Sequence, residues 1–204
     1  MGRWNCKTQM AQACPKPCQT LGSGRVDACE ENRMSLSEQV ILLVDDDANE
    51  VLLMERAFQK ANMKNRLNVA RDGQQAIDYL HRQGNFADTT RYPTPILILL
   101  DLKMPGKNGF EVLEWLRRQP GLRRLLVVVL SSSNLIDDVN RAYDLGANSY
   151  LVKPGDFATL IDLVKTLGTY WLRLNRHPDV EPEPGPAEPA PRYQIQAESS
   201  CPTA

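Results

Sequence analysis

The stretch Val-Ile-Leu-Leu-Val-Asp-Asp-Asp at residues 40–47 decides the fold, because five aliphatic residues run without a break into three carboxylates. An unbroken aliphatic run of this length is typical of a strand that is covered on both faces. Similar runs follow at 96–100 and 125–130, and two weaker strands fit 66–70 and 149–152. The sequence therefore predicts five strands.

Apolar residues at helical spacing fill the intervals between these strands. Val51, Met54 and Phe58 recur at intervals of three and four residues, which places them on one face of a helix. Comparable patterns occupy the later intervals, in 77–80, 110–116, 139–145 and 160–171. Strands that alternate with helices form a parallel sheet with helices on both faces, so we expect a doubly wound α/β fold with five helices.

Two flanks of different composition surround this pattern. Residues 1–33 hold four of the five Cys and almost no apolar periodicity, and the segment 177–204 is rich in Pro and Glu. Neither flank carries enough apolar surface to offset its ordering entropy, so we expect a disordered leader over 1–33 and a disordered tail over 177–204. One self-supporting domain is expected over 34–176. Met34 is an alternative natural start, in which case the leader is not native.

Charge and hydropathy exclude several classes of protein. The net charge is −1, and the segment after the domain is short and acidic, so we expect no DNA-binding domain. The longest apolar run, 125–130, is far too short to span a bilayer. The amino-terminal residues lack the apolar core of a secretory signal, which favours a cytoplasmic protein without a membrane partner. Five irregularly spaced Cys also disfavour a disulfide scaffold.

Polar side chains follow four of the five strands at the point where each strand ends. Acids follow the first and third strands, a hydroxyl follows the fourth and an ammonium follows the fifth; these residues are Asp45, Asp46, Asp47, Asp101, Ser131 and Lys153. In a doubly wound sheet such strand ends meet at one edge. Crowded carboxylates repel one another unless a cation is present, and oxygen ligands suit Mg²⁺. The pattern predicts a cage for a phosphoryl group on a carboxylate.

Helix capping is an alternative explanation for part of this pattern. Asp47 is well placed as an N-cap, with Asn49 and Glu50 in the first helical turn. The serine run 131–133 could likewise be a loop with one capping hydroxyl. Capping does not, however, explain why acid, hydroxyl and ammonium occur together at four strand ends.

Residues 39–172 closely resemble a response-regulator receiver domain. The resemblance is carried by Val-Asp-Asp at 44–46, Leu-Leu-Asp-Leu-Lys-Met-Pro at 99–105, Val-Val-Leu-Ser at 128–131 and Gly-Ala-Asn-Ser-Tyr-Leu-Val-Lys-Pro at 146–154. The motifs occur in the order that the family has. The resemblance implies a flavodoxin-like fold with strand order 2-1-3-4-5.

The same resemblance implies a role for each residue of the acidic group. Asp101 corresponds to the phospho-acceptor. Asp45 and Asp46 correspond to the acidic pair that holds Mg²⁺ together with Asp101, and the backbone carbonyl of Lys103 corresponds to a further metal ligand. Lys103 itself departs from the family, since its long cationic side chain lies close to where water would attack the phosphoryl group.

Three further residues correspond to the family's switch. Ser131 matches the switch hydroxyl, which the phosphoryl group draws inward. Tyr150 matches the aromatic residue that moves between exposed and buried positions. Lys153 matches the lysine that contacts the phosphoryl group, and the resemblance suggests a cis bond between Lys153 and Pro154. Ordinary packing of Tyr150 against a helix remains an alternative.

The resemblance implies a two-component response regulator that accepts a phosphoryl group from a histidine kinase. It implies no metabolic enzyme, and at most self-phosphorylation and self-dephosphorylation. The long connection at 82–95 and the extended last helix at 170–172 resemble single-domain regulators of bacterial phytochromes, and the apolar residues at 170–172 suggest a homodimer through the last helices. A regulator of another histidine kinase, or a receiver-like scaffold that is not phosphorylated, is the alternative.

Overall fold

The structure is a computed structural model, and it describes residues 39–180. The leader predicted over 1–33 lies outside the described residues, as does the predicted tail from residue 181 onward. No helix within 39–180 is long and apolar enough to cross a membrane.

Five parallel strands form one sheet in the order β2-β1-β3-β4-β5. Both the number of strands and their order agree with the sequence prediction. Each strand begins within one residue of its expected start; the bounds are β1 Val40–Val44, β2 Arg66–Ala70, β3 Leu97–Leu100, β4 Leu126–Ser131 and β5 Ser149–Val152. The neighbours of β1 are β2 and β3, so the winding direction reverses at β1, where a doubly wound sheet places its ligands.

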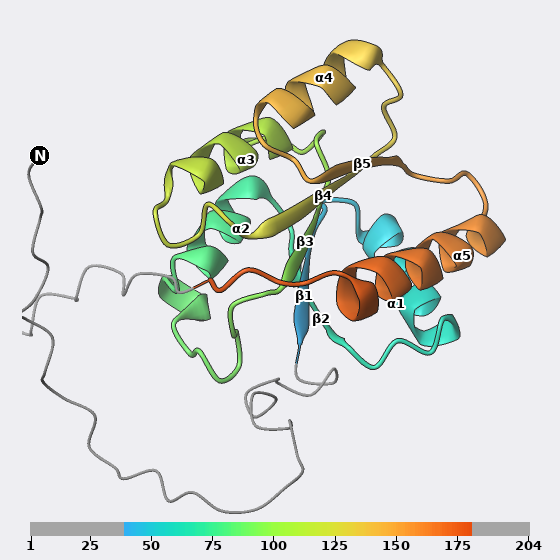
Figure 1. Cartoon of the computed structure of the whole chain (residues 1–204), viewed down its shortest axis with the longest axis horizontal. Coiled ribbons are helices and arrows are strands. Elements are labelled where there is room, and N and C mark those ends of the chain that lie inside the picture. Colours follow the sequence, from blue (N-terminus) through green and yellow to red (C-terminus); the bar gives the residue numbers. More distant parts are fainter. Residues whose placement is uncertain (1–38, 181–204) are drawn as a thin grey trace, which may run out of the picture. The chain divides into compact units, whose positions relative to one another are not determined.

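Five α-helices cover the sheet, as Figure 1 shows: α2, α3 and α4 lie over one face, and α1 and α5 over the other. Their bounds are α1 Ala48–Lys60, α2 Gly73–Leu80, α3 Gly109–Arg118, α4 Ile136–Asp144 and α5 Phe157–Leu167. A π-helical segment, η2 (Gly168–Leu174), continues α5, as expected from the apolar residues beyond it. A short 3-10 helix, η1 (Gly84–Phe86), lies in the long connection before β3.

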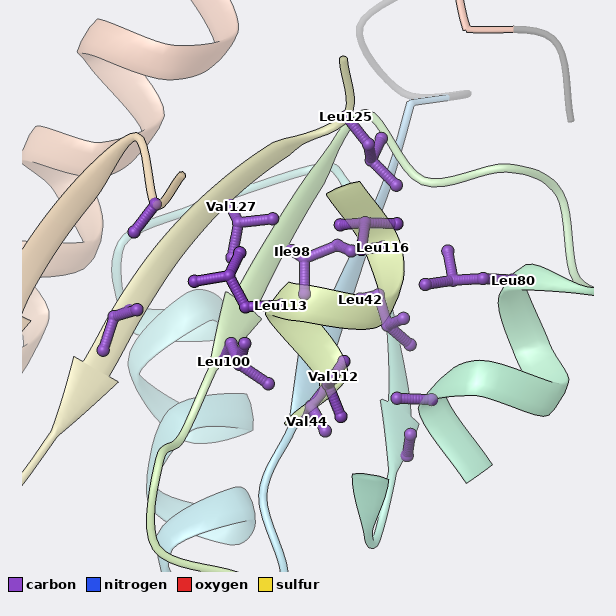
Figure 2. Packing of buried hydrophobic residues seen from close by; sticks show 14 of the residues in the cluster. Leu42, Val44, Leu80, Ile98, Leu100, Val112, Leu113, Leu116, Leu125 and Val127 are labelled. Carbon is purple, nitrogen blue, oxygen red and sulfur yellow. The ribbon is translucent and has the colours of Figure 1, made fainter. Parts of the chain in front are cut away.

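The core consists of two apolar clusters, one on each face of the sheet. Figure 2 shows the first, in which Leu42 and Ile98 of the sheet pack beside Leu113 and Leu116 of α3. Neighbouring strand residues point to opposite faces, so Leu43 belongs instead to the second cluster, under α1 and α5. Helices therefore cover both faces of β1, β3 and β4, which explains why these three strands are fully buried and almost wholly aliphatic.

Helix α4 is the least buried of the five α-helices that the structure describes. Ala142 is its one buried residue, and Tyr143 is 49% exposed. The apolar pattern expected over 139–145 includes Tyr143, which is nevertheless exposed because α4 has few contacts with the sheet, mainly with β5.

A buried hydrogen-bond chain anchors the long connection between α2 and β3. The Asn68 amide in β2 donates to the Tyr79 hydroxyl at 2.7 Å, and that hydroxyl donates to the Pro93 carbonyl at 2.9 Å. The rings of Phe86 and Tyr92 contact Tyr79, with centroids 5.4 and 5.8 Å away. The connection is therefore packed against the domain.

The chain after η2 turns back along the amino-terminal edge of the sheet, and its last part is visible in Figure 1 as the red segment. Val180 packs against the cluster under α2 and α3, and Asp179 lines a cavity of about 290 Å³ with Arg123 and Arg124, which precede β4. Packed chain thus continues past residue 176, where we expected the domain to end.

Candidate functional site

Three carboxylates gather at the carboxyl edge of the sheet. Asp45 and Asp46 follow β1, Asp101 follows β3, and one oxygen from each lies within 4.8 Å of the others. The parallel register pairs Val44 with Leu100, so the next residues, Asp45 and Asp101, are neighbours. Asp45 and Asp101 are buried, whereas Asp46 is exposed. Such a set of hard oxygen ligands, one of them open to solvent, fits Mg²⁺ or a similar divalent ion.

Backbone groups fix the orientation of the two buried carboxylates. The backbone N–H of Asp47 donates to Oδ1 of Asp45 at 3.0 Å, and the N–H of Leu102 donates to Oδ1 of Asp101 at 2.8 Å. The Oδ2 atoms of both aspartates lie toward the Lys153 ammonium. Short local bonds therefore set which oxygen of each acid faces the others.

Lys153, from the end of β5, brings a positive charge into this group. Its Nζ donates to Oδ2 of Asp45 at 2.8 Å and lies 3.7 Å from Oδ2 of Asp101. It also donates to the carboxylate of Glu50, in the first turn of α1. One ammonium thus interacts with three carboxylates, each of them more than 50 residues before it in the sequence.

The surroundings shift the pKa of both central groups. Burial raises the pKa of Asp101, Lys153 opposes that rise, and the neighbouring Asp45 charge adds to it. Burial alone would lower the pKa of Lys153, but its hydrogen bonds to Asp45 and Glu50 outweigh burial and raise it. The ionised form of Asp101 is therefore costly without a further cation, while Lys153 stays charged.

Ser131 and Tyr150 occupy adjoining strands beside the acids. Ser131, the last residue of β4, is fully buried, and its Oγ accepts from the backbone N–H of Ser133 at 3.3 Å. The Tyr150 hydroxyl donates to the Ser133 carbonyl at 2.9 Å, and the Ser133 hydroxyl donates to Asp138 of α4. Ser132 is exposed. The serine run therefore connects the end of β4 both to Tyr150 and to α4.

The loop after Asp101 is closed by a tight approach at Gly109. The N–H of Gly109 donates to the Leu102 carbonyl at 3.1 Å, and a Cβ at Gly109 would lie only 2.2 Å from the carbonyl oxygen of Asp101. A side chain at this position would displace the backbone that carries Asp101. Lys103 lies within this loop with its side chain exposed.

The suggested cis bond between Lys153 and Pro154 is wrong, because no peptide bond within the described part of the chain is cis. The trans form is intrinsically favoured before proline by about 0.5–1 kcal/mol. The backbone N–H of Lys153 donates to the Ser131 carbonyl at 2.9 Å, so the strand pairing continues up to this residue and places the side chain beside the acids with a trans bond.

Glu50 is the member of the site that sequence reasoning missed. Its acidic side chain suits the first turn of α1, and this local role hides its contact with Lys153, which is 103 residues away. The sequence held only a weak signal for this contact. Glu50 is the third residue of a helix that begins just after the acids that follow the first strand.

Comparison with known proteins agrees with this geometry. Residues 41–165 match the response regulator receiver domain family. The chain is 40% identical over 141 residues to the probable methanogenesis regulatory protein FilR2 of Methanothrix harundinacea, which covers 68% of this chain and 87% of that protein. It is 37% identical over 134 residues to the response regulator Rcp1 of Synechocystis, which covers 66% of this chain and 89% of that protein.

Solved structures of such regulators have the same architecture. The phosphorylated cyanobacterial phytochrome response regulator RcpA has a TM-score of 0.64 at 35% identity and covers 69% of this chain and 99% of its own. The Mn²⁺-bound form of Rcp1 has a TM-score of 0.62 at 36% identity, over 69% and 99% of the two chains. With the sheet order and the acidic group at its carboxyl edge, these matches show that the chain belongs to the response-regulator receiver domain family of two-component signalling.

Proposed function

We propose that Asp101 accepts a phosphoryl group from a phosphohistidine of a histidine kinase. The observation that carries this proposal is the group of Asp45, Asp46 and Asp101 at one edge of the sheet, with the Lys153 ammonium beside it. An Asp101 oxygen attacks phosphorus, the P–N bond to histidine breaks, and the histidine nitrogen takes up a proton. The product is an acyl phosphate on Asp101.

Mg²⁺ is the proposed cofactor. Asp45, Asp46, Asp101 and the backbone carbonyl of Lys103 would hold it, and the bound ion would neutralise negative charge on the phosphoryl oxygens. The crowded oxygen ligands support this choice. The Mn²⁺-bound structure of the relative Rcp1 also supports a divalent ion.

The phosphoryl group would act as a switch through Ser131 and Tyr150. Ser131 would donate a hydrogen bond to a phosphoryl oxygen, and Lys153 would contact another. Because Ser133 bonds both to Tyr150 and to α4, a displacement of β4's end would be transmitted to the surface formed by α4 and β5. Phosphorylation can shift the equilibrium between an inactive and an active conformation only if the phosphoryl group interacts differently with the two. The contacts of the phosphoryl group with Ser131 and Lys153 would supply that difference.

The acceptor is tested by Asp101→Asn and acetyl phosphate as a small phosphodonor. We expect acid-labile phosphate to form on the unsubstituted chain with Mg²⁺ and to be lost in the variant. Asp144→Asn, which removes an exposed acid at the end of α4, is the matched control and should label normally. Undiminished labelling of the Asp101 variant would refute the assignment.

We also propose that the kinase is a bacterial phytochrome and that the protein acts in the cytoplasm. The likeness to the phytochrome response regulator RcpA supports this partner. The alternative is another histidine kinase, and the likeness to FilR2, which is described as a methanogenesis regulator, favours it. Phosphotransfer profiling against the histidine kinases of the source organism tests the choice: fastest transfer from a light-sensing kinase supports phytochrome, and fastest transfer from another kinase contradicts it.

A homodimer through the last helices is a further part of the proposal. A groove of about 310 Å³ between β5 and the last helices is lined by Leu163, Tyr170 and Trp171, and Tyr170 is 52% exposed. Leu172, by contrast, is buried in the core. Light scattering should show a dimer for the unsubstituted chain and a monomer for Tyr170→Glu; a monomeric unsubstituted chain would exclude the dimer.

The protein is a signalling regulator by family, and its own chemistry would be limited to self-phosphorylation and self-dephosphorylation of Asp101. Lys103 projects into solvent two residues after the acceptor and would influence loss of the phosphoryl group. Lys103→Ala changes the lifetime of the acyl phosphate if the side chain has this influence, and an unchanged lifetime would exclude it.

A further inference from the structure

The contact between Glu50 and Lys153 is an additional ion pair inside the acidic group. Glu50 lies in α1, and Lys153 directly follows β5. The Glu50 side chain is 40% exposed, whereas the side chains of Lys153 and Asp45 are only 15% and 4% exposed. Glu50 is thus the one partner of this lysine, among those that the structure describes, whose side chain can leave toward water at little cost.

An acid at the third position of a helix usually accepts a hydrogen bond from the backbone N–H of the N-cap residue, but in α1 another side chain accepts this bond. In α3, Glu111 accepts from the backbone N–H of the N-cap residue Asn108 at 2.9 Å, which completes a capping box. In α1, the corresponding N–H belongs to Asp47, and it donates to Asp45 instead. Glu50 is therefore not needed as a cap, and its carboxylate reaches Lys153.

This ion pair competes with a phosphoryl group on Asp101 for the positive charge of Lys153. A lysine ammonium has three N–H donors, and here Asp45 and Glu50 each take one while Asp101 lies 3.7 Å away. A phosphoryl group on Asp101 would bring more negative charge toward the same ammonium. Glu50 both competes for Lys153 and repels an incoming anionic donor.

We propose that Glu50 is a positioning residue that holds Lys153 in the unphosphorylated protein and is displaced from it when Asp101 carries a phosphoryl group. Glu50 thereby opposes phosphorylation and sets how readily the chain takes up phosphate. A cavity of about 100 Å³, lined by Glu50, Lys153, Leu53 and Pro154, gives the displaced side chain room beside its present position. This inference rests on the proposed phosphorylation of Asp101.

The test compares Glu50→Gln with Glu55→Gln. The glutamine side chain keeps nearly the same shape as glutamate and lacks its charge. Glu55 lies on an exposed part of the same helix, so its variant removes an equal charge away from Lys153. With acetyl phosphate and Mg²⁺, we expect Glu50→Gln to be labelled about threefold faster, the effect typical of one partly exposed ion pair. Glu55→Gln should match the unsubstituted chain.

A binding measurement that involves no turnover gives the second readout. Beryllofluoride, a mimic of the phosphoryl group, should bind Glu50→Gln about threefold more tightly in calorimetry with Mg²⁺ present. Mg²⁺ alone should bind the variant and the unsubstituted chain with nearly equal affinity, because Glu50 lies outside the three gathered aspartates. More than about tenfold weaker Mg²⁺ binding would show that Glu50 supports the metal site itself, as a ligand or as a partner of one, and would overturn the proposal.

The results separate this inference from the proposed function. If the unsubstituted chain takes up no phosphate and binds no beryllofluoride, the phosphorylation of Asp101 itself fails. If it does both and Glu50→Gln behaves like Glu55→Gln, or is slower, then Asp101 is the acceptor and the role of Glu50 is refuted.

Discussion

The Nζ atom of Lys153 lies 3.7 Å from Oδ2 of Asp101, close enough for strong attraction between the charges but beyond hydrogen-bonding distance. The same nitrogen donates to Asp45 at 2.8 Å. Lys153 therefore balances part of the charge of Asp101 without donating a hydrogen bond to its Oδ2 atom. A carboxylate held in this way remains free to act as a nucleophile.

Replacement of Lys153 should destabilise the metal-free protein. Lys153→Met leaves Asp45 and Asp101 buried side by side, so we expect the free energy of unfolding in EDTA at pH 7 to fall by about 2 kcal/mol. Urea unfolding measures this change, and added Mg²⁺ should restore part of it. Lys165→Met is the control, since Lys165 pairs with Asp162 on the surface and should cost less than about 0.5 kcal/mol. Equal losses would show that Lys153 does not offset buried charge.

Removal of the Asp101 charge should have the opposite effect on stability. The folded-state pKa of Asp101 is raised, so the folded state favours the protonated form, and ionisation of this group costs stability as pH rises through the folded-state pKa. Asp101→Asn should therefore raise the melting temperature in EDTA at pH 7. The gain should vanish below about pH 4, where Asp is protonated in the unfolded chain as well. A gain that persists at low pH would point to a cause other than charge.

Ser131 should be needed for the response but not for phosphorylation. We expect Ser131→Ala to take up phosphate from acetyl phosphate and to lose the change that phosphorylation produces around α4 and Tyr150, because Ala cannot donate to a phosphoryl oxygen. Amide chemical shifts with and without beryllofluoride measure this change. Ser132→Ala, at an exposed position, is the control. A full response in the Ser131 variant would show that another serine provides the switch.

Gly109 should be intolerant of a side chain. In Gly109→Ala, the new Cβ would meet the Asp101 carbonyl oxygen at 2.2 Å, so the loop that carries the acceptor must move. We expect a loss of about 2 kcal/mol in unfolding free energy and slower labelling of Asp101. Gly155→Ala is the matched control, because nothing lies within 4 Å of a Cβ placed there. If the two variants are equally stable and label equally fast, the close approach is not required.

The fold and the acidic group could be predicted because both depend on patterns that are local in sequence. Uninterrupted aliphatic runs identified the buried strands. The polar residue after each run identified the side chains that would lie at the carboxyl edge of the sheet. Parallel pairing then brings Asp45 next to Asp101 without any detail of side-chain packing. This is why the gathering of three carboxylates and the nearby Lys153 was expected.

Contacts that depend on side-chain competition could not be predicted. Glu50 looked like an ordinary acid in a first helical turn, and only the structure shows that Asp45 takes the Asp47 N–H and leaves Glu50 for Lys153. Tyr143 fitted a helical apolar pattern, yet it is exposed because α4 makes a narrow contact with the sheet. The roles of Ser131 and Tyr150 in a switch remain predictions.

The path of the chain after η2 has a practical consequence. Asp179 lies beside residues that precede β4, at the end of the strands opposite to Asp45 and Asp101, and Val180 packs against the apolar cluster under α2 and α3. A fluorescent reporter joined after Val180 would start on the side remote from the acids and leave the approach of a kinase unobstructed. One attached at the start of α1 would stand directly in that approach.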